Sequence, residues 1–299
     1  SETLTANIEI SHFGQEELKQ QTVSWSVSDE NGKQILKGQF LPKDIKIANC
    51  QQLGLISFPL KQFSKAEKLE LKVNLDGVTT NSWNFWVYPD QLPTLDEKDI
   101  YVCNEIDEKA KETLNKGGKV LLLLAGRVEQ GKDVIQYMTP SFWNTSWFKM
   151  RPPHTQGSLI NNYHPVFKYF PTDYYTDLQW WELTHRGQVM ELNNFPADFQ
   201  PIIQPIDTWF INRKLGSLFE ANVSNGKIIV CSSDLVTDLN HRIVARQLYY
   251  SIIKYMKTIH FNPEYTIDIS LIEDILRKEG ERINTYTKDA PDELKNIVL

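Results

Sequence analysis

The chain has 299 residues, which is enough for two domains of ordinary size, each with its own core. Apolar residues make up 41% and charged residues 23%, a composition typical of soluble globular proteins rather than disordered ones. The 32 basic and 38 acidic residues give a net charge of −6, without a basic stripe, so no nucleic-acid partner is expected. The longest apolar run covers residues 120–125 and is far shorter than the roughly 20 residues that cross a bilayer, so no membrane insertion is expected.

The first 90 residues read as strands throughout. Val23, Trp25 and Val27 alternate with serines, a period-2 pattern with one apolar face. The pairs Asn31-Gly32 and Asp76-Gly77 suit tight turns that need positive φ. Further strands are expected at residues 4–10, 34–40, 53–60, 69–75 and 83–88. Six or seven short strands at this spacing predict an immunoglobulin-like antiparallel sandwich over residues 1–90, with Trp25 as its core aromatic residue.

Residues 96–260 alternate strands with helices and predict an α/β domain. A short apolar strand at residues 99–103 precedes Asp107, which can cap a helix that ends at Gly117-Gly118. Residues 119–125 are apolar on both faces, as in the centre of a parallel sheet. This strand–helix–strand unit predicts a mostly parallel sheet, with some antiparallel strands added.

The rest of the chain adds strands, a hairpin and two helices. Strands are expected at residues 187–192, 202–206, 215–223 and 227–232, and Ser224-Asn225-Gly226 is typical of a hairpin turn. A long helix is expected after Asn240. Residues 261–299 form a helical tail, in which Ser270 and Glu273 make a capping box and Gly280 stops the helix. Beyond Asn284 no periodicity is strong, and a loosely held end is expected.

Motifs of hydrolytic or metal chemistry are weak. Cys50, Cys103 and Cys231 lie far apart and lack the small neighbours of a strained nucleophile turn, so they indicate neither a zinc site nor a catalytic thiol. Glu105 follows Asn104, as an acid/base carboxylate does in many barrel glycosidases, but too few strand–helix pairs follow it to close a barrel. The histidines show no ligand spacing, and no metal or cofactor is expected.

The densest signal lies between Tyr137 and Trp181, where thirteen residues are aromatic, Trp143 and Trp147 among them. Flat rings with polar edges suit stacking on sugar faces, but a long irregular segment can also pack its rings onto the sheet as a lid. The lid is the favoured interpretation, and sugar contact stays open as the alternative. The candidate ligand-binding residues here are His164, Asp173, Gln179, Trp180 and Trp181.

A second cluster supplies the other candidate ligand-binding residues, which are Gln204, Asp207, Trp209, Asn212 and Arg213. Asp207 and Arg213 are close enough in sequence to pair. Arginine also suits a bidentate contact with a carboxylate. A structural network that joins the aromatic segment to the sheet is the leading interpretation. Ser232, Ser233 and Asp234 follow the last strand, where open α/β sheets usually bind ligands, although they serve equally well at a helix entry.

These clusters carry a family resemblance. Residues 81–89 (NSWNFWVYP) and 11–14 (SHFG) resemble the sandwich of many bacterial glycoside hydrolase family 2 proteins described as β-galactosidases. The second half resembles the C-terminal α/β module of some of those enzymes, which is similar to class I glutamine amidotransferase-like and trehalose-utilisation-protein-like domains. The matching motifs in this half are His164-Pro165, Phe170-Pro171-Thr172, Gln179-Trp180-Trp181, Gln204-Pro205-Ile206-Asp207 and Asn212-Arg213. The resemblance implies a flavodoxin-like or amidotransferase-like doubly wound sheet after the sandwich.

The chain also departs from that family, since neither the sugar-binding jelly roll, nor the catalytic barrel, nor the amidotransferase nucleophile can be found in it. No catalytic residue can therefore be carried over. We expect an accessory, non-catalytic C-terminal fragment that supports, orients or oligomerises the catalytic domains of a glycosidase in glycan degradation. The alternatives are a carbohydrate-binding module that uses residues 137–181, and an independent hydrolase with His164, Asp207 and Arg213 around a pocket at the strand ends.

The expected partners are the parent's catalytic domains, an oligosaccharide, or a second copy of the chain. No apolar signal segment follows Ser1, so either the protein is made without one or the chain is a mature or excised piece. A periplasmic or cell-surface location is implied by the resemblance alone.

Overall fold

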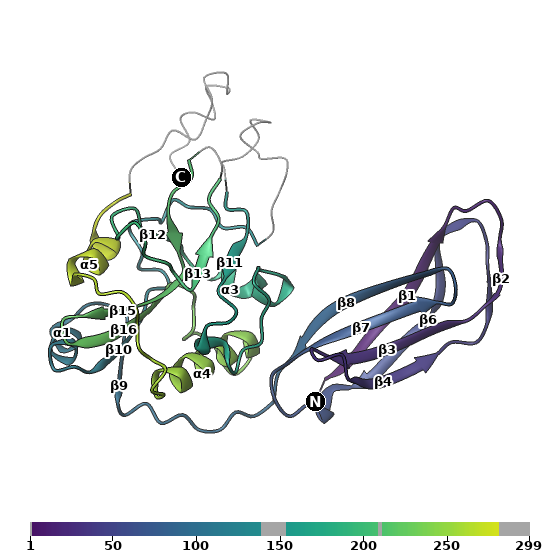
Figure 1. Ribbon diagram of the computed structural model, residues 1–299, viewed down its shortest axis with the longest axis horizontal. Helices are drawn as coiled ribbons and strands as arrows, with labels where there is room; N and C mark the ends of the chain where they lie inside the picture. The colour runs from purple at the N-terminus through teal and green to yellow at the C-terminus, as the bar shows by residue number, and fades with distance from the viewer. Residues whose placement is uncertain (1, 139–153, 209–210, 281–299) are drawn as a thin grey trace, which may run out of the picture. The chain divides into compact units, whose positions relative to one another are not determined.

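The computed structural model describes residues 2–138, 154–208 and 211–280. The chain divides into two compact units, one ending at Pro93 and the other beginning at Thr94. The first is built from antiparallel strands, and the second combines a mixed sheet with helices (Figure 1).

In the first unit, a four-stranded and a two-stranded antiparallel sheet pack face to face, and β2 and β5 form a further antiparallel pair. One sheet has the order β4-β3-β7-β8, and β1 pairs with β6 in the other. The strands are β1 (Thr3–His12), β2 (Leu18–Gln21), β3 (Val23–Asp29), β4 (Gln34–Gln39), β5 (Lys43–Ile45), β6 (Ala48–Pro59), β7 (Glu67–Leu75) and β8 (Thr79–Val87), with a short 3₁₀ helix η1 (Leu60–Gln62). Ile8 and Ile56 meet Val27 and Leu71 in one buried cluster, because alternate residues of each strand face the opposite sheet.

The turns of this unit follow their sequence signals. Gly32 and Gly77 have φ values of 77° and 71°, a region that glycine enters without steric cost. Trp25 is partly rather than fully buried, and its ring stacks on Phe58 with the centroids 6.4 Å apart. The Trp25 ring therefore packs at the border of the core. It lies against Gly38 of the neighbouring strand β4, where the lack of a side chain leaves room for the ring.

The second unit contains a six-stranded sheet in the order β11-β13-β15-β16-β10-β9. Its strands are β9 (Ile100–Cys103), β10 (Lys119–Leu123), β11 (Ser158–Ile160), β13 (Ile203–Pro205), β15 (Leu218–Val223) and β16 (Gly226–Cys231). The expectation of a mostly parallel sheet is wrong: β10 pairs in parallel with β9 and β16, but the other three pairings are antiparallel. The predicted hairpin at Ser224, whose φ is 53°, accounts for the β15–β16 pairing. The expectation failed at β13, which pairs antiparallel with both β11 and β15, and these pairings depend on contacts between segments that no tight turn joins.

Two smaller strands, β12 (Met190–Glu191) and β14 (Leu215–Gly216), pair separately from this sheet. They correct two expectations, because only two residues of the segment 187–192 form a strand, and the segment 215–223 is broken at Ser217. Ser217 lies between β14, which pairs with β12, and β15, which pairs with β16. Its carbonyl accepts from the amide of Ser232 at 2.9 Å.

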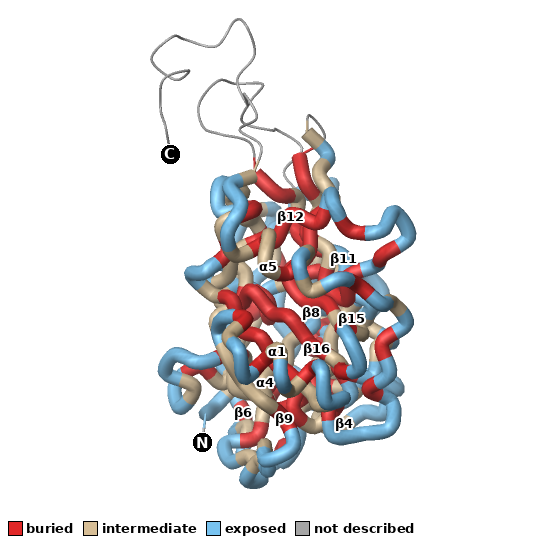
Figure 2. The backbone as a smooth tube through the Cα atoms, turned by 90° about the vertical axis from the view of Figure 1, so that its left-hand side faces the viewer, coloured by how far each residue is buried: buried red, intermediate tan, exposed pale blue. Residues whose placement is uncertain are grey.

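Helices cover the sheet of the second unit. They are α1 (Glu108–Asn115), α3 (Trp181–His185), α4 (Ile243–Met256) and α5 (Ile269–Arg277), with the 3₁₀ helices η2 (Pro165–Phe167) and η3 (Leu178–Trp180). Leu114 of α1 and Ile272 of α5 belong to one buried cluster with Val120 and Leu122 of β10, and Figure 1 shows α1 beside β10. Leu121 points to the opposite face and is also fully buried, so β10 is covered on both sides. Figure 2 shows β16 as a largely buried segment of the same unit.

Aspartate side chains cap the first turns of α1 and α5, and the second of these caps was not the one predicted. Asp107 caps α1 as expected, because its carboxylate accepts from the amide of Ala110 at 2.7 Å. The capping box predicted at Ser270 is wrong: Asp268 caps α5 and accepts from the amide of Ser270 at 2.8 Å. The helix ends at Arg277, earlier than the predicted stop at Gly280. The expected loose end beyond residue 284 lies outside the described residues.

Candidate functional site

The polar residues that follow β13 form one buried network. The side chain of Asp207 is 2% exposed and that of Arg213 is 7% exposed. Oδ2 of Asp207 accepts from the backbone amide and from Nε of Arg213, at 2.8 and 2.9 Å. Oδ1 accepts from the amide of Thr208 at 2.9 Å and from Nη2 of Arg213 at 3.3 Å. Both carboxylate oxygens are thus occupied by their own loop, and the predicted Asp207–Arg213 pair is confirmed.

Two acidic residues that the sequence analysis did not single out, Asp133 and Glu191, lie near this network. Asp133 lies 3.2 Å from Nη1 of Arg213, through its Oδ2. Burial lowers the pKa of Arg213, but the contacts with Asp207 and Asp133 outweigh it and raise that pKa overall. Glu191 is 6% exposed, and burial raises the pKa of its carboxyl above the usual range, although Arg213 opposes the shift. Its Oε1 accepts from Asn193 at 2.7 Å, and Oε2 has no partner among the residues described.

His164 belongs to a different cluster. It caps η2, where its Nδ1 accepts from the amide of Val166 at 3.3 Å. Its Nε2 lies 3.6 Å from Oε1 of Glu220, and its ring meets that of Tyr255 edge-on, with the centroids 5.2 Å apart. The hydroxyl of Tyr255 donates to Oε2 of the same glutamate at 2.8 Å. Among the described residues, none of the contacts of this cluster involves Asp207 or Arg213, so the structure does not bring the three predicted residues together.

The aromatic segment divides into buried and exposed rings. Trp180 is 2% exposed, its ring meets Phe170 edge-on at 5.2 Å, and its Nε1 donates to Oγ1 of Thr172 at 2.9 Å. Nε2 of Gln179 donates to the carbonyl of Pro171 at 2.9 Å, so two of the sequence motifs pack against each other. Trp181, by contrast, is 56% exposed, and its ring lies 3.9 Å from that of His185. Trp143 and Trp147 lie outside the described residues.

The remaining predicted residues have varied surroundings. Asp173 is half-buried, and its carbonyl accepts from the hydroxyl of Thr172 at 3.1 Å. Gln204 lies in β13, opposite Leu159 of β11. Asn212 is exposed, with a φ of 61° in the turn that precedes Arg213. Trp209 lies outside the described residues.

The residues after β16 have structural contacts. The hydroxyl of Ser232 donates to the carbonyl of Gln188 at 2.6 Å. The carboxylate of Asp234 accepts from the amides of Val236 and Thr237 and lies 3.0 Å from Nη1 of Arg242. These contacts belong to the turn that follows β16. The helix-entry role left open by the sequence is not met at these residues, because α4 begins only at Ile243.

The buried thiols and the acidic side chains do not form a reactive or metal-binding site among the described residues. Burial raises the pKa of Cys103 to about 11 and that of Cys231 to about 12, so both stay protonated at neutral pH and are weak nucleophiles. Glu105 is exposed, and its nearest ion-pair partner is Arg127 at 3.5 Å. Within residues 2–138, 154–208 and 211–280, no three histidines, cysteines or acidic residues gather closely enough to hold a metal ion.

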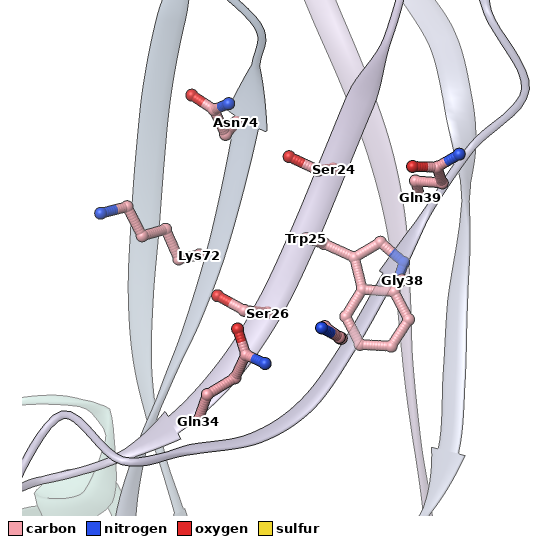
Figure 3. A pocket seen from close by; sticks show the side chains of 9 residues that line it. Ser24, Trp25, Ser26, Gln34, Gly38, Gln39, Lys72 and Asn74 are labelled. Atoms are coloured by element: carbon pink, nitrogen blue, oxygen red, sulfur yellow. The ribbon is translucent and has the colours of Figure 1, made fainter.

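A hollow on the first unit was not predicted. It has a volume of about 630 Å³ on the sheet β4-β3-β7-β8. We call it the sandwich trough and define it by Ser24, Ser26, Lys37, Gln39, Lys72 and Asn74, which come from three neighbouring strands (Figure 3). In the second unit, a hollow beside Trp180 and Ser217 has a volume of about 10 Å³, too small for a sugar. None of the helices described has the length and apolar composition needed to span a membrane.

The comparisons with known proteins add a family but no activity. The model of a family described as a domain of unknown function, DUF8487, matches residues 101–277. A second model, also described as a domain of unknown function, DUF8488, matches residues 2–89. No curated protein matches the chain.

Proposed function

The chain belongs to the DUF8487 family, and we propose that it is an accessory, non-catalytic part of a glycoside hydrolase family 2 protein. In this role it supports or orients the catalytic domains during glycan degradation, at the cell surface or in the periplasm. The unit up to Pro93 is then an immunoglobulin-like domain, and the unit from Thr94 on is an amidotransferase-like one.

Two kinds of observation support the domain assignments. The motifs of residues 11–14 and 81–89 resemble that family, and the first unit packs antiparallel sheets over one core. In the second unit, the parallel strands β9, β10 and β16 form the half of the sheet that a doubly wound domain requires. The antiparallel strands β11, β13 and β15 then extend that half on one side.

The observation that carries the accessory role is that the side chains predicted for a hydrolase site, Asp207 and His164, are already occupied by structural contacts. A general base or nucleophile needs a lone pair that can reach a substrate. Both oxygens of Asp207 instead accept hydrogen bonds from their own loop and from Arg213. In His164, Nδ1 accepts a hydrogen bond from the amide of Val166, and Nε2 lies 3.6 Å from Oε1 of Glu220.

The proposal is tested by assaying the purified chain on aryl β-galactosides and a panel of other aryl glycosides, with and without a chelator. We expect no turnover above the uncatalysed rate. Hydrolysis that is independent of metal and copurifies with the chain would overturn the accessory role. The coding region before Ser1 provides a second test, because a family 2 barrel encoded there supports the proposal and an unrelated reading frame contradicts it.

A second function, sugar binding by the aromatic segment, is favoured by the exposure of Trp181. A ring that is 56% exposed and held against His185 offers a flat face to a sugar. Affinity gels with neutral galactan test this, with Trp181→Ala as the variant and Phe13→Ala, another exposed aromatic residue, as the control. Retention lost in the Trp181 variant alone supports sugar binding, and equal retention of both variants contradicts it. Trp180→Ala is unsuitable, because Trp180 is buried and its loss would disturb the fold.

A further inference from the structure

The sandwich trough follows the central strand of a sheet. In β3, Val23 and Val27 face the core, so Ser24 and Ser26 face the opposite, outer side. Short side chains on a central strand leave a depression wherever the neighbouring strands carry longer ones. That is the arrangement in Figure 3, where the two serines lie between residues of β7 and β4.

The strand registers place the walls of the trough in two rows. Ser26 is opposite Lys37 of β4 on one side and Lys72 of β7 on the other. Ser24 is likewise opposite Gln39 and Asn74. Each row therefore has a hydroxyl at its centre and a longer nitrogen-bearing side chain at each end. The volume of about 630 Å³ falls within the range of ligand sites, roughly 300–1,000 Å³.

The two rows differ in charge. Lys37 and Lys72 are both exposed, and neither ammonium group makes an ion pair or hydrogen bond with another group in the part of the chain that the structure describes. Since neighbouring strands lie about 4.8 Å apart, the two lysine backbones are separated by about 10 Å, with Ser26 between them. A single anionic group above Ser26 can thus be reached by both ammonium groups.

Acidic residues near the trough limit where an anion fits. Glu70 lies on the same face, two residues before Lys72, and Asp76 follows Asn74 at the other end. The amide of Asn74 donates to Asp76 at 2.6 Å and its oxygen accepts from Thr80 at 2.6 Å, so that side chain is already oriented. Ser24 also donates to Asp76, at 3.5 Å. The positive charge is therefore concentrated at the Lys37–Ser26–Lys72 row, whereas the Ser24 row borders a carboxylate.

From this arrangement we propose that the sandwich trough binds an oligosaccharide that bears anionic groups, either carboxylate or sulfate. The anionic group lies between Lys37 and Lys72, and the sugar hydroxyls meet Ser24, Ser26 and Gln39. That the ligand is a saccharide rests on the proposed function, whereas the need for negative charge rests on the unpaired lysines.

The test is affinity electrophoresis of the whole chain in gels that contain polygalacturonate, dextran sulfate or neutral galactan. One variant, Lys37→Gln with Lys72→Gln, removes the charge. A second, Ser26→Tyr, fills the trough without touching the core, and tyrosine suits a strand better than serine. Lys61→Gln removes one exposed lysine elsewhere on the same unit and serves as the control.

We expect retention on one or both anionic gels, weakening as salt is added because exposed charges are screened. The double lysine variant should bind about fivefold to tenfold more weakly, given the modest effect of each exposed charge contact. Ser26→Tyr should abolish retention, and Lys61→Gln should bind like the parent chain. The gel that retains the chain distinguishes carboxylate from sulfate.

Three outcomes would overturn this inference. One is equal retention on neutral and anionic gels with no effect of the lysine changes. Another is an absence of retention on every gel by a folded chain. The third is a concentration-dependent dimer that Ser26→Tyr abolishes, because a second copy would then occupy the trough. None of these outcomes decides the accessory role, which the glycosidase assay and the coding region test separately.

Discussion

Replacing Asp207 by asparagine should destabilise the second unit strongly. The carboxylate accepts four hydrogen bonds, and its side chain is only 2% exposed. Asparagine keeps the shape but turns an NH₂ group toward donors, so about two of these bonds are lost. Hydrogen bonds to charged groups contribute about 1.5–3 kcal/mol each, and breaking a buried pair costs about 3–5 kcal/mol. Because Asp133 still contacts Arg213 at 3.2 Å, we expect a loss of about 3 kcal/mol rather than the upper value.

The measurement is urea unfolding, with hydrogen exchange of the β10 amides reporting the second unit separately from the first. Asp133→Asn is the matched control: its carboxylate is about half exposed, so we expect it to cost about 1 kcal/mol or less. If Asp207→Asn lowered the free energy of unfolding no more than Asp133→Asn does, the network would not be structural. The accessory role would then lose its main support.

Three further changes have clear expected outcomes. Gly38→Ala should destabilise the first unit by about 1–3 kcal/mol in thermal unfolding, because its Cβ would lie 2.6 Å from the ring of Trp25; an unchanged midpoint would contradict this packing. At pH 8 a maleimide should modify exposed Cys50 readily but Cys231 only after unfolding, since burial raises the pKa of Cys231 to about 12; mass mapping that finds both labelled in the folded chain would refute it. Burial raises the pKa of Glu191, so its ionised form opposes folding, and this cost grows as pH rises above the ordinary glutamate pKa. Glu191→Gln should therefore stabilise the second unit at pH 7 and have little effect at pH 3, and equal effects at both pH values would contradict the reasoning.

Local signals in the sequence were sufficient for turns and for most strands. Gly32 and Gly77 adopt the positive φ that their turns require, and Asp107 caps its helix through the amide of Ala110. Each depends on residues fewer than four positions apart, so no distant contact could reverse it. The cap of α5 was misplaced because Asp268 and Ser270 are both good capping residues, and the register of the helix against the core decided between them.

Pairing between distant segments was harder to predict. The sheet of the second unit was expected to be mostly parallel, but the partners of β11, β13 and β15 depend on contacts across the chain. His164 and Arg213 are both near aromatic residues in the sequence, yet one contacts Glu220 and the other contacts Asp133. These partners are about 50 to 80 residues away, and loop lengths alone do not indicate which of many such pairs will form.

The amino-acid sequence by itself therefore determined the strand periodicity, the tight turns, the first helix cap and the Asp207–Arg213 pair, because neighbouring residues decide each of them. Only the tertiary structure decided that this pair is buried and saturated, and that His164 lies in another cluster. It also created the sandwich trough, since Ser26 meets Lys37 and Lys72 only after three strands are set in register. The physical reason is that side-chain alternation specifies which face a residue occupies, whereas strand pairing specifies its neighbours.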